Sequence, residues 1–272
     1  MKNKNITFGF AVSIYFLIIP LILILIYLLP ECTKIALSLN TGNPSLYSII
    51  TSGYTHLTFT HFFFNFIIYL FIVSFIFYFD SKRNNKMLFL NIILIFLLLQ
   101  IIYSLLSLGL FSYFGKHVLD KGFSTILAGL IGYLPISYVY FLKYKKKIEF
   151  DNSYYLLLLF FSFNLSLITL INGWYLVLII LIPFFVACLY LSLKDLQKIR
   201  DYFIGLSRKK SFALLYIQIV AILLCLFATI GLFPSSLKGD SGLTNIFAHY
   251  VGYVYGFTIP AFVSLKLLKW NK

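Results

Sequence analysis

The chain has 272 residues, is 61% hydrophobic and carries only 11% charged residues, a composition too apolar for a soluble domain of this size. Its formal net charge of +14 could suggest a nucleic-acid partner, but the sequence contains no soluble basic domain that could bind one. In a membrane protein, excess Lys and Arg instead mark the cytoplasmic loops. We therefore expect an all-α polytopic membrane protein, embedded in the lipid bilayer, with a single domain over residues 1–272.

Eight apolar segments reach or approach the roughly 20 residues that a bilayer-spanning helix needs. In chain order they cover residues 8–29, 59–79, 87–112, 122–142, 154–171, 174–193, 211–233 and 243–265. Asn172 and Gly173 predict a tight turn between the fifth and sixth segments. Residues 80–86 are expected to form a cytoplasmic turn, and residues 194–210 a short helix on the membrane surface.

The basic residues predict the orientation of these helices. Eighteen of the 22 Lys and Arg residues fall in segments on one side of the expected topology, and four fall on the other side. Cytoplasmic loops carry the excess of positive charge. The sequence therefore predicts a multi-pass protein of the cell membrane with both termini in the cytoplasm, and with residues 30–55, 113–121 and 234–242 on the outer side.

The cysteines give no sign of a metal or a disulfide. Cys188 and Cys225 lie inside apolar segments, and Cys32 follows the first one. No Cys-x-x-Cys pair or Cys/His spacing typical of a metal site occurs. Neither a metal nor another cofactor is expected.

Two segments carry a polar residue followed by small residues at helical spacing. These stripes are Ser124, Ala128 and Gly132 in the fourth span, and His249, Gly252 and Gly256 in the eighth. Small residues on one face allow another helix backbone to approach closely. We expect the two stripes to face each other and to bring Ser124 to His249, since both polar residues stand at the outer end of their helix.

Three further polar residues stand at the outer end of the second span. His61 and Asn65 are four residues apart and share a helix face, and His56 precedes them in the adjoining turn. Polar groups below a membrane surface are costly and are often functional. A single His near a helix end is more often an interfacial residue, but this group lies at the depth expected for Ser124 and His249.

The chemistry that fits these residues is nucleophilic catalysis. A serine hydroxyl becomes a good nucleophile when a neutral imidazole takes its proton, and the imidazolium can then protonate the leaving amine. Donors such as a His N–H, an Asn amide and the Ser124 backbone N–H could stabilise the oxyanion that forms. No carboxylate is well placed to orient the imidazole, so a Ser–His dyad is expected rather than a triad.

These residues resemble the motifs of the rhomboid family of intramembrane serine proteases. The family's second helix carries H-x4-H-x3-N, its fourth begins G-x-S-x, and its last carries A-H-x2-G-x3-G. The matching residues are His56, His61 and Asn65; Gly122 and Ser124, with Gly132 and Tyr133 in register below; and Ala248, His249, Gly252 and Gly256. The chain departs from the family at Thr125, where glycine is frequent, and at Ala128, where an aromatic residue is frequent.

The resemblance implies a fold, an activity and roles. The fold would be a rhomboid-like six-helix core with two extra helices. Ser124 would be the nucleophile and His249 the general base, while His61, Asn65 and His56 would stabilise the transition state. Gly122, Ala128, Gly132, Gly252 and Gly256 would pack the helices at the site. The protein would be a serine endopeptidase that cuts transmembrane segments of membrane protein substrates near the outer face.

Three other interpretations remain open at this point. A catalytically silent rhomboid-like protein could bind transmembrane clients without cutting them, although that role needs neither Ser124 nor His249. A transporter would favour a site at the midplane and intramembrane acids. A metalloprotease would need an HExxH motif or acidic partners for its histidines, and the sequence has neither.

Overall fold

The computed structural model describes residues 2–83, 85–231, 238–239, 242–243 and 246–269. It confirms an all-α polytopic membrane bundle. Eight helices in the described part of the chain are long and apolar enough to cross a membrane. The expected end of the seventh span at 233, the start of the eighth at 243 and much of the 234–242 loop lie outside the described residues.

The chain forms two compact units. The first unit comprises residues 1–133 and 237–272, and the second comprises residues 134–236. Helix α8 (Ser124–Tyr144) starts in the first unit and ends in the second. The expectation of a single domain stays a prediction.

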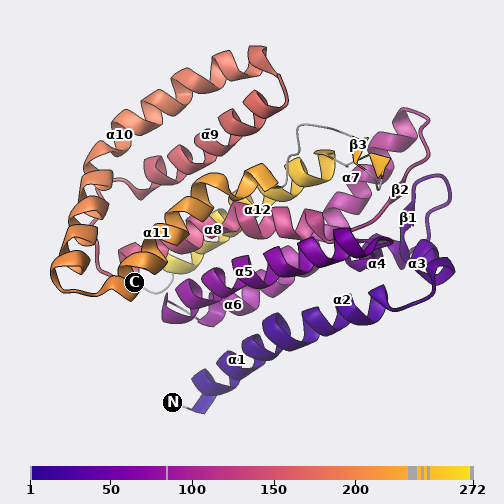
Figure 1. Cartoon of the computed structure of the whole chain (residues 1–272), viewed down its shortest axis with the longest axis horizontal. Coiled ribbons are helices and arrows are strands. Elements are labelled where there is room, and N and C mark those ends of the chain that lie inside the picture. The colour runs from indigo at the N-terminus through magenta and orange to yellow at the C-terminus, as the bar shows by residue number, and fades with distance from the viewer. Residues whose placement is uncertain (1, 84, 232–237, 240–241, 244–245, 270–272) are drawn as a thin grey trace. The chain divides into compact units, whose positions relative to one another are not determined.

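The first unit contains the helices that carry the polar residues singled out in the sequence (Figure 1). Its helical elements are α1 (Lys2–Ser13), η1 (Ile14–Ile18), α2 (Ile19–Tyr27), α3 (Glu31–Leu37), α4 (Ser48–Thr51), η2 (Ser52–Tyr54), α5 (Phe59–Arg83), α6 (Asn85–Asn91), η3 (Ile92–Leu98), α7 (Leu99–Tyr113), the start of α8, and α12 (Ile246–Lys269). The π-helices η1 and η3 continue the helices on either side of them, so the first and third spans are each one run of helix.

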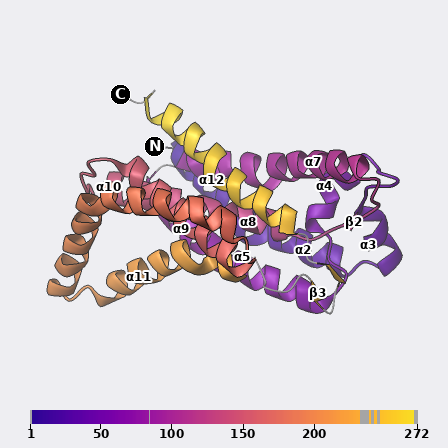
Figure 2. The same ribbon diagram turned by 90° about the horizontal axis from the view of Figure 1, so that it is seen from above.

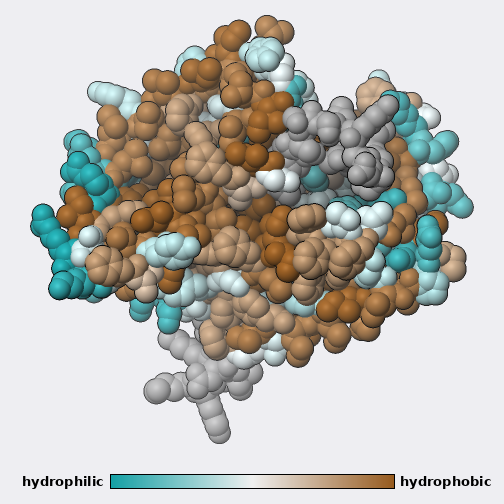
Figure 3. Space-filling view, in the orientation of Figure 1, coloured by the Kyte–Doolittle hydropathy of each residue, from teal (hydrophilic) through white to brown (hydrophobic). Residues whose placement is uncertain are grey.

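Two short antiparallel strand pairs occur in the loops of the first unit. Strand β1 (Leu39–Asn40) pairs with β2 (Leu119–Asp120), which joins the loop after the first span to the segment that leads into α8. Strand β3 (Lys238–Gly239) pairs with β4 (Gly242–Leu243) ahead of α12. In the space-filling view, hydrophobic side chains cover the faces of α2 and α5, and hydrophilic ones gather at the right-hand edge near α3 and β1 (Figure 3).

The buried carboxylate of Asp80 corrects one feature of the expected topology. Residues 80–86 were expected to form a turn, but α5 continues to Arg83, and α6 begins at Asn85. Asp80 is fully buried and accepts hydrogen bonds from Asn91 Nδ2 at 3.1 Å and from Tyr133 Oη at 2.8 Å. These bonds satisfy the carboxylate inside the protein, which allows the helix to continue past it.

The second unit is built around a helical hairpin. Helix α9 (Ser153–Ile171) and helix α10 (Tyr175–Arg208) lie side by side, as Figures 1 and 2 show, and Gly173 turns the chain between them with a φ of +71°. Helix α11 (Phe212–Phe227) and η4 (Ala228–Gly231) follow. Asn164 of α9 donates to the Cys225 carbonyl of α11 at 2.8 Å, which holds the hairpin to α11.

The surface helix expected at 194–210 does not form as a separate element. Helix α10 continues without a break from Tyr175 to Arg208. The residues after 193 are mostly good helix formers, and no Gly or Pro interrupts them before Gly205, so nothing in the local sequence ends the helix. Asp195 on this extension is buried and accepts the backbone N–H groups of Asp151 (2.7 Å) and Asn152 (3.1 Å), which lie just before α9.

Candidate functional site

The two stripes of small residues lie against each other in the first unit. A β-carbon added to Gly252 would overlap the Thr125 carbonyl oxygen and lie 2.9 Å from the Ala128 β-carbon. One added to Gly256 would overlap the backbone of Gly129. Only glycine on α12 allows the two helix backbones to approach this closely. Figures 1 and 2 show α12 running beside α8.

The same contact continues one turn further along α8. A β-carbon on Gly132 would overlap the carbonyl oxygen of Tyr253 and lie 3.0 Å from the backbone nitrogen of Phe257. Ala128 is fully buried in this seam, where its β-carbon faces Gly252 of α12, so a larger side chain at this position would crowd the helix pair. The alanine is therefore matched to the close packing of this particular helix pair.

The register of this contact relates His249 to Ser124. Moving four residues along α12, from Gly252 to Gly256, moves the contact four residues along α8, from Thr125 to Gly129, so the helices are parallel. His249 precedes Gly252 by three residues, close to one helical turn. His249 therefore lies at the level of residues 122–125, where α8 begins. Ser124, the first residue of α8, falls within this range.

Burial differs between these two residues. His249 is 7% exposed, and Ser124 is half-buried. Near the start of α12, Tyr103 of α7 and Phe247 of α12 have ring centroids 6.3 Å apart, so this end of α12 also packs on α7. His249 is thus largely excluded from solvent, whereas Ser124, at the same level along the helices, is more accessible.

The second group, His56, His61 and Asn65, lies against the residues just before Ser124. Asn65 Nδ2 lies 3.0 Å from His56 Nε2, and the rings of His56 and His61 meet edge-on with centroids 5.0 Å apart. The backbone N–H of Phe123 points at His56 Nε2 at 3.4 Å. These contacts join α5 to the start of α8.

Gly122 forms the other contact between α5 and this segment. Its φ of +115° lies in the region that favours glycine, and an added β-carbon would lie 2.8 Å from His61 Cε1. Its backbone N–H donates to the Ser52 carbonyl at 2.9 Å. The glycine therefore lets the chain turn into α8 directly beneath the His61 ring.

His56 is neutral at physiological pH. Burial, and then the neighbouring His61 ring, lower the pKa of His56 to about 3. A neutral imidazole has one nitrogen that accepts a hydrogen bond, and here Nε2 faces both the Asn65 amide and the Phe123 N–H. His56 therefore orients the Asn65 side chain and the backbone that leads to Ser124.

A polar face on α7, which the sequence reasoning missed, supports this backbone from behind. It consists of Gln100, Tyr103, Ser104 and Ser107, all buried. Gln100 donates to Ser52 Oγ at 3.1 Å, while Tyr103 and Ser107 both donate to Asp120 Oδ2. The spacing i, i+3, i+4, i+7 within an apolar span was the signal that could have revealed it.

An aromatic cluster fixes Phe123, the residue immediately before Ser124. Phe123 is fully buried, and its ring centroid lies 5.3 Å from that of Tyr69 and 5.6 Å from that of Tyr54. The Tyr69 pair is edge-to-face, the favourable arrangement for aromatic rings. Burying so large a side chain next to the serine anchors the start of α8.

Taken together, the arrangement offers a hydroxyl, an imidazole at its level and a set of amide and imidazole donors beside it. Among the described residues, no group of three His, Cys, Asp or Glu side chains is arranged to hold a metal ion. His117 lies apart from this group, beside Gly42 in the loop before β2. Comparisons with models of known families, with curated proteins and with solved structures find no match.

Proposed function

We propose that this chain is an intramembrane serine endopeptidase. Ser124 acts as the nucleophile, and His249 takes its proton and later returns it to the leaving amine. The observation that carries the proposal is the parallel backbone contact of α8 and α12, whose register sets His249 level with the turn that begins at Ser124.

The donors beside the nucleophile give the proposal its second support. In the proposed reaction, Asn65, His61 and the Ser124 backbone N–H stabilise the oxyanion, and His56 holds the Asn65 amide in place. Substrates are the transmembrane segments of other proteins, cut near the outer face of the cell membrane. The proposed topology places both termini in the cytoplasm, as the basic residues predict.

The test uses purified full-length protein in liposomes with a model transmembrane substrate. Ser124→Ala and His249→Ala should each lower cleavage by about 1,000-fold or more. Asn65→Ala should lower it by about 100- to 1,000-fold. Ser74→Ala and His117→Ala are matched controls, because the Ser74 hydroxyl donates to Leu70 of its own helix and His117 lies beside Gly42; both should retain activity.

A serine-directed fluorophosphonate probe separates this function from the client-binding alternative. The proposed enzyme should be labelled at Ser124, and His249→Ala should abolish the labelling. Wild-type protein that stays unlabelled and inert toward varied substrates, yet can be crosslinked to transmembrane segments, would instead establish a catalytically silent protein that binds membrane clients.

A further inference from the structure

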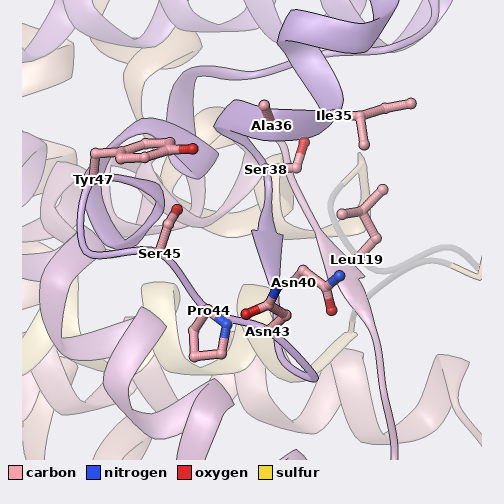
Figure 4. Close-up of a pocket in the computed structure, with 9 residues that line it drawn as sticks. All are labelled: Ile35, Ala36, Ser38, Asn40, Asn43, Pro44, Ser45, Tyr47 and Leu119. Atoms are coloured by element: carbon pink, nitrogen blue, oxygen red, sulfur yellow. The ribbon is translucent and has the colours of Figure 1, made fainter.

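A small cavity lies in the loop region between the first two spans of the first unit (Figure 4). Its volume is about 280 Å³, just below the usual range for sites that bind drug-sized ligands. It is lined by Ile35, Ala36, Ser38, Asn40, Asn43, Pro44, Ser45, Tyr47 and Leu119. The volume suits a single small chemical group.

The lining chemistry restricts what that group can be. None of the lining residues named above carries a charge, which disfavours phosphate, carboxylate and ammonium ligands. No described residue hydrogen-bonds to the Asn43 amide, the Ser45 hydroxyl or the Tyr47 hydroxyl, and the Asn40 carboxamide uses only its oxygen, which accepts the Gly42 N–H. These groups offer both donors and acceptors, which match a ligand with several hydroxyls.

Apolar surfaces accompany these polar groups. Tyr47 is 53% exposed and lies across the cavity from Leu119, with its hydroxyl directed inward (Figure 4). The face of an aromatic ring carries partial negative charge and attracts the C–H groups of a sugar or glycerol. A polyol is recognised through both kinds of contact: its hydroxyls hydrogen-bond to polar side chains, and its C–H groups lie on an aromatic ring.

The surroundings of the cavity indicate a membrane ligand. Leu46 is 85% exposed, Ile35 44% and Ile50 40%, although all three lie between the first two spans, Ile35 in α3, Ile50 in α4 and Leu46 in the loop between these short helices. Such side chains are costly in open water but favourable among lipid headgroups and the upper acyl chains, where Tyr is also frequent. These exposures favour a position of the cavity mouth at the level of the lipid headgroups.

We propose that this cavity binds the uncharged polyhydroxyl headgroup of a membrane lipid, such as a hexose linked to diacylglycerol. Asn40 and Leu119, which are paired between β1 and β2, both line the cavity, so a bound headgroup contacts both strands. Leu119 is followed by Asp120, which α7 holds, and then by the residues that lead to Ser124. The headgroup thus braces the segment that precedes α8.

The test measures lipid binding by the full chain, and it uses the Ser124→Ala variant in parallel because binding requires no catalysis. The protein is placed in phosphatidylcholine nanodiscs with or without a minor fraction of monoglucosyl diacylglycerol. Native mass spectrometry should detect one retained glucosyl lipid, and the melting temperature should rise by about 2–4 °C. Unglycosylated diacylglycerol should produce neither effect.

Variants connect the effect to the cavity. Asn43→Ala and Tyr47→Ala should lose both the retained lipid and the thermal shift, whereas Tyr113→Ala, an 84% exposed tyrosine outside the cavity, should keep them. If free methyl glucoside also raises the melting temperature, the sugar alone is sufficient for binding. If only the glucosyl lipid raises it, the acyl chains contribute to binding as well. Equal retention of glucosyl lipid by wild type and by both cavity variants would overturn the proposal, whatever the result of the protease assay.

Discussion

Gly256 of α12 lies so close to Gly129 of α8 that no β-carbon could stand between them. This contact, and the matching one of Gly252 with Thr125, sets the level along α8 at which His249 lies. The candidate site therefore depends on a seam of glycines about one to two turns below it.

Gly256→Ala should destabilise the protein by about 3 kcal/mol or more, because the added methyl group forces the helix backbones apart. Gly109→Ala in α7 is the matched control, since a β-carbon there meets nothing within 4 Å. It should be neutral or slightly stabilising. Unfolding in mixed micelles measures both variants, and equal stability of Gly256→Ala and wild type would contradict the close contact.

The neutral, buried state of His56 should make stability depend on pH. Its folded pKa of about 3 is below the unfolded value near 6.5, so the unfolded chain binds more protons between these values. Stability should be complete above pH 6.5 and fall as the pH is lowered toward 3, by about 2–3 kcal/mol at pH 4.5.

His56→Gln provides the comparison for this pH dependence, because glutamine can still contact Asn65 but does not titrate. The free energy of unfolding of this variant should depend less on pH between 6.5 and 4.5 than that of wild type. Parallel pH profiles for the two proteins would show that His56 is not the titrating group.

The hydrogen bond from Tyr133 to Asp80 should stabilise α5 against α8. Tyr133→Phe removes only the hydroxyl and leaves a fully buried carboxylate with one donor fewer, at an expected cost of about 1–3 kcal/mol. A double-mutant cycle with Asp80→Asn should give a coupling energy of at least about 0.5 kcal/mol. Tyr113→Phe, at an exposed tyrosine, should leave stability unchanged; additive effects of the two buried changes would argue against a direct bond.

Two buried glutamines should respond in opposite directions to replacement by leucine. Neither amide atom of Gln218 in α11 has a hydrogen-bonding partner among the described residues, so Gln218→Leu should stabilise the protein by about 1–2 kcal/mol. Gln100 donates to Ser52 and Ser104, and Gln100→Leu should destabilise it by about 1–3 kcal/mol. Comparable loss of stability in both variants would indicate that Gln218 is satisfied by internal water.

Much of the architecture could be read from hydropathy because each span is long and continuous. The spans at α8 and α9 agree with the expected segments to within about two residues, since each is bounded by polar or turn residues. The expected boundary after residue 193 was wrong because the change there is one of polarity, not of helix propensity, and α10 continues through it. Asp80 was expected in a turn for a related reason, because a charged residue near the end of a span usually marks a loop. The buried hydrogen-bond partners that keep Asp80 inside the bundle are seen only in the structure.

For the candidate site, the pattern of residue types pointed to Ser124, His249, His56, His61 and Asn65, and it predicted that small residues would line the helices that carry them. Which α8 residue each α12 glycine meets, how His56 engages Asn65, and the support from Gln100 and Tyr103 were decided only by the tertiary structure. The reason is physical. A hydropathy pattern and helical spacing are properties of one segment, whereas register and hydrogen-bond partners depend on the approach of segments more than 100 residues apart.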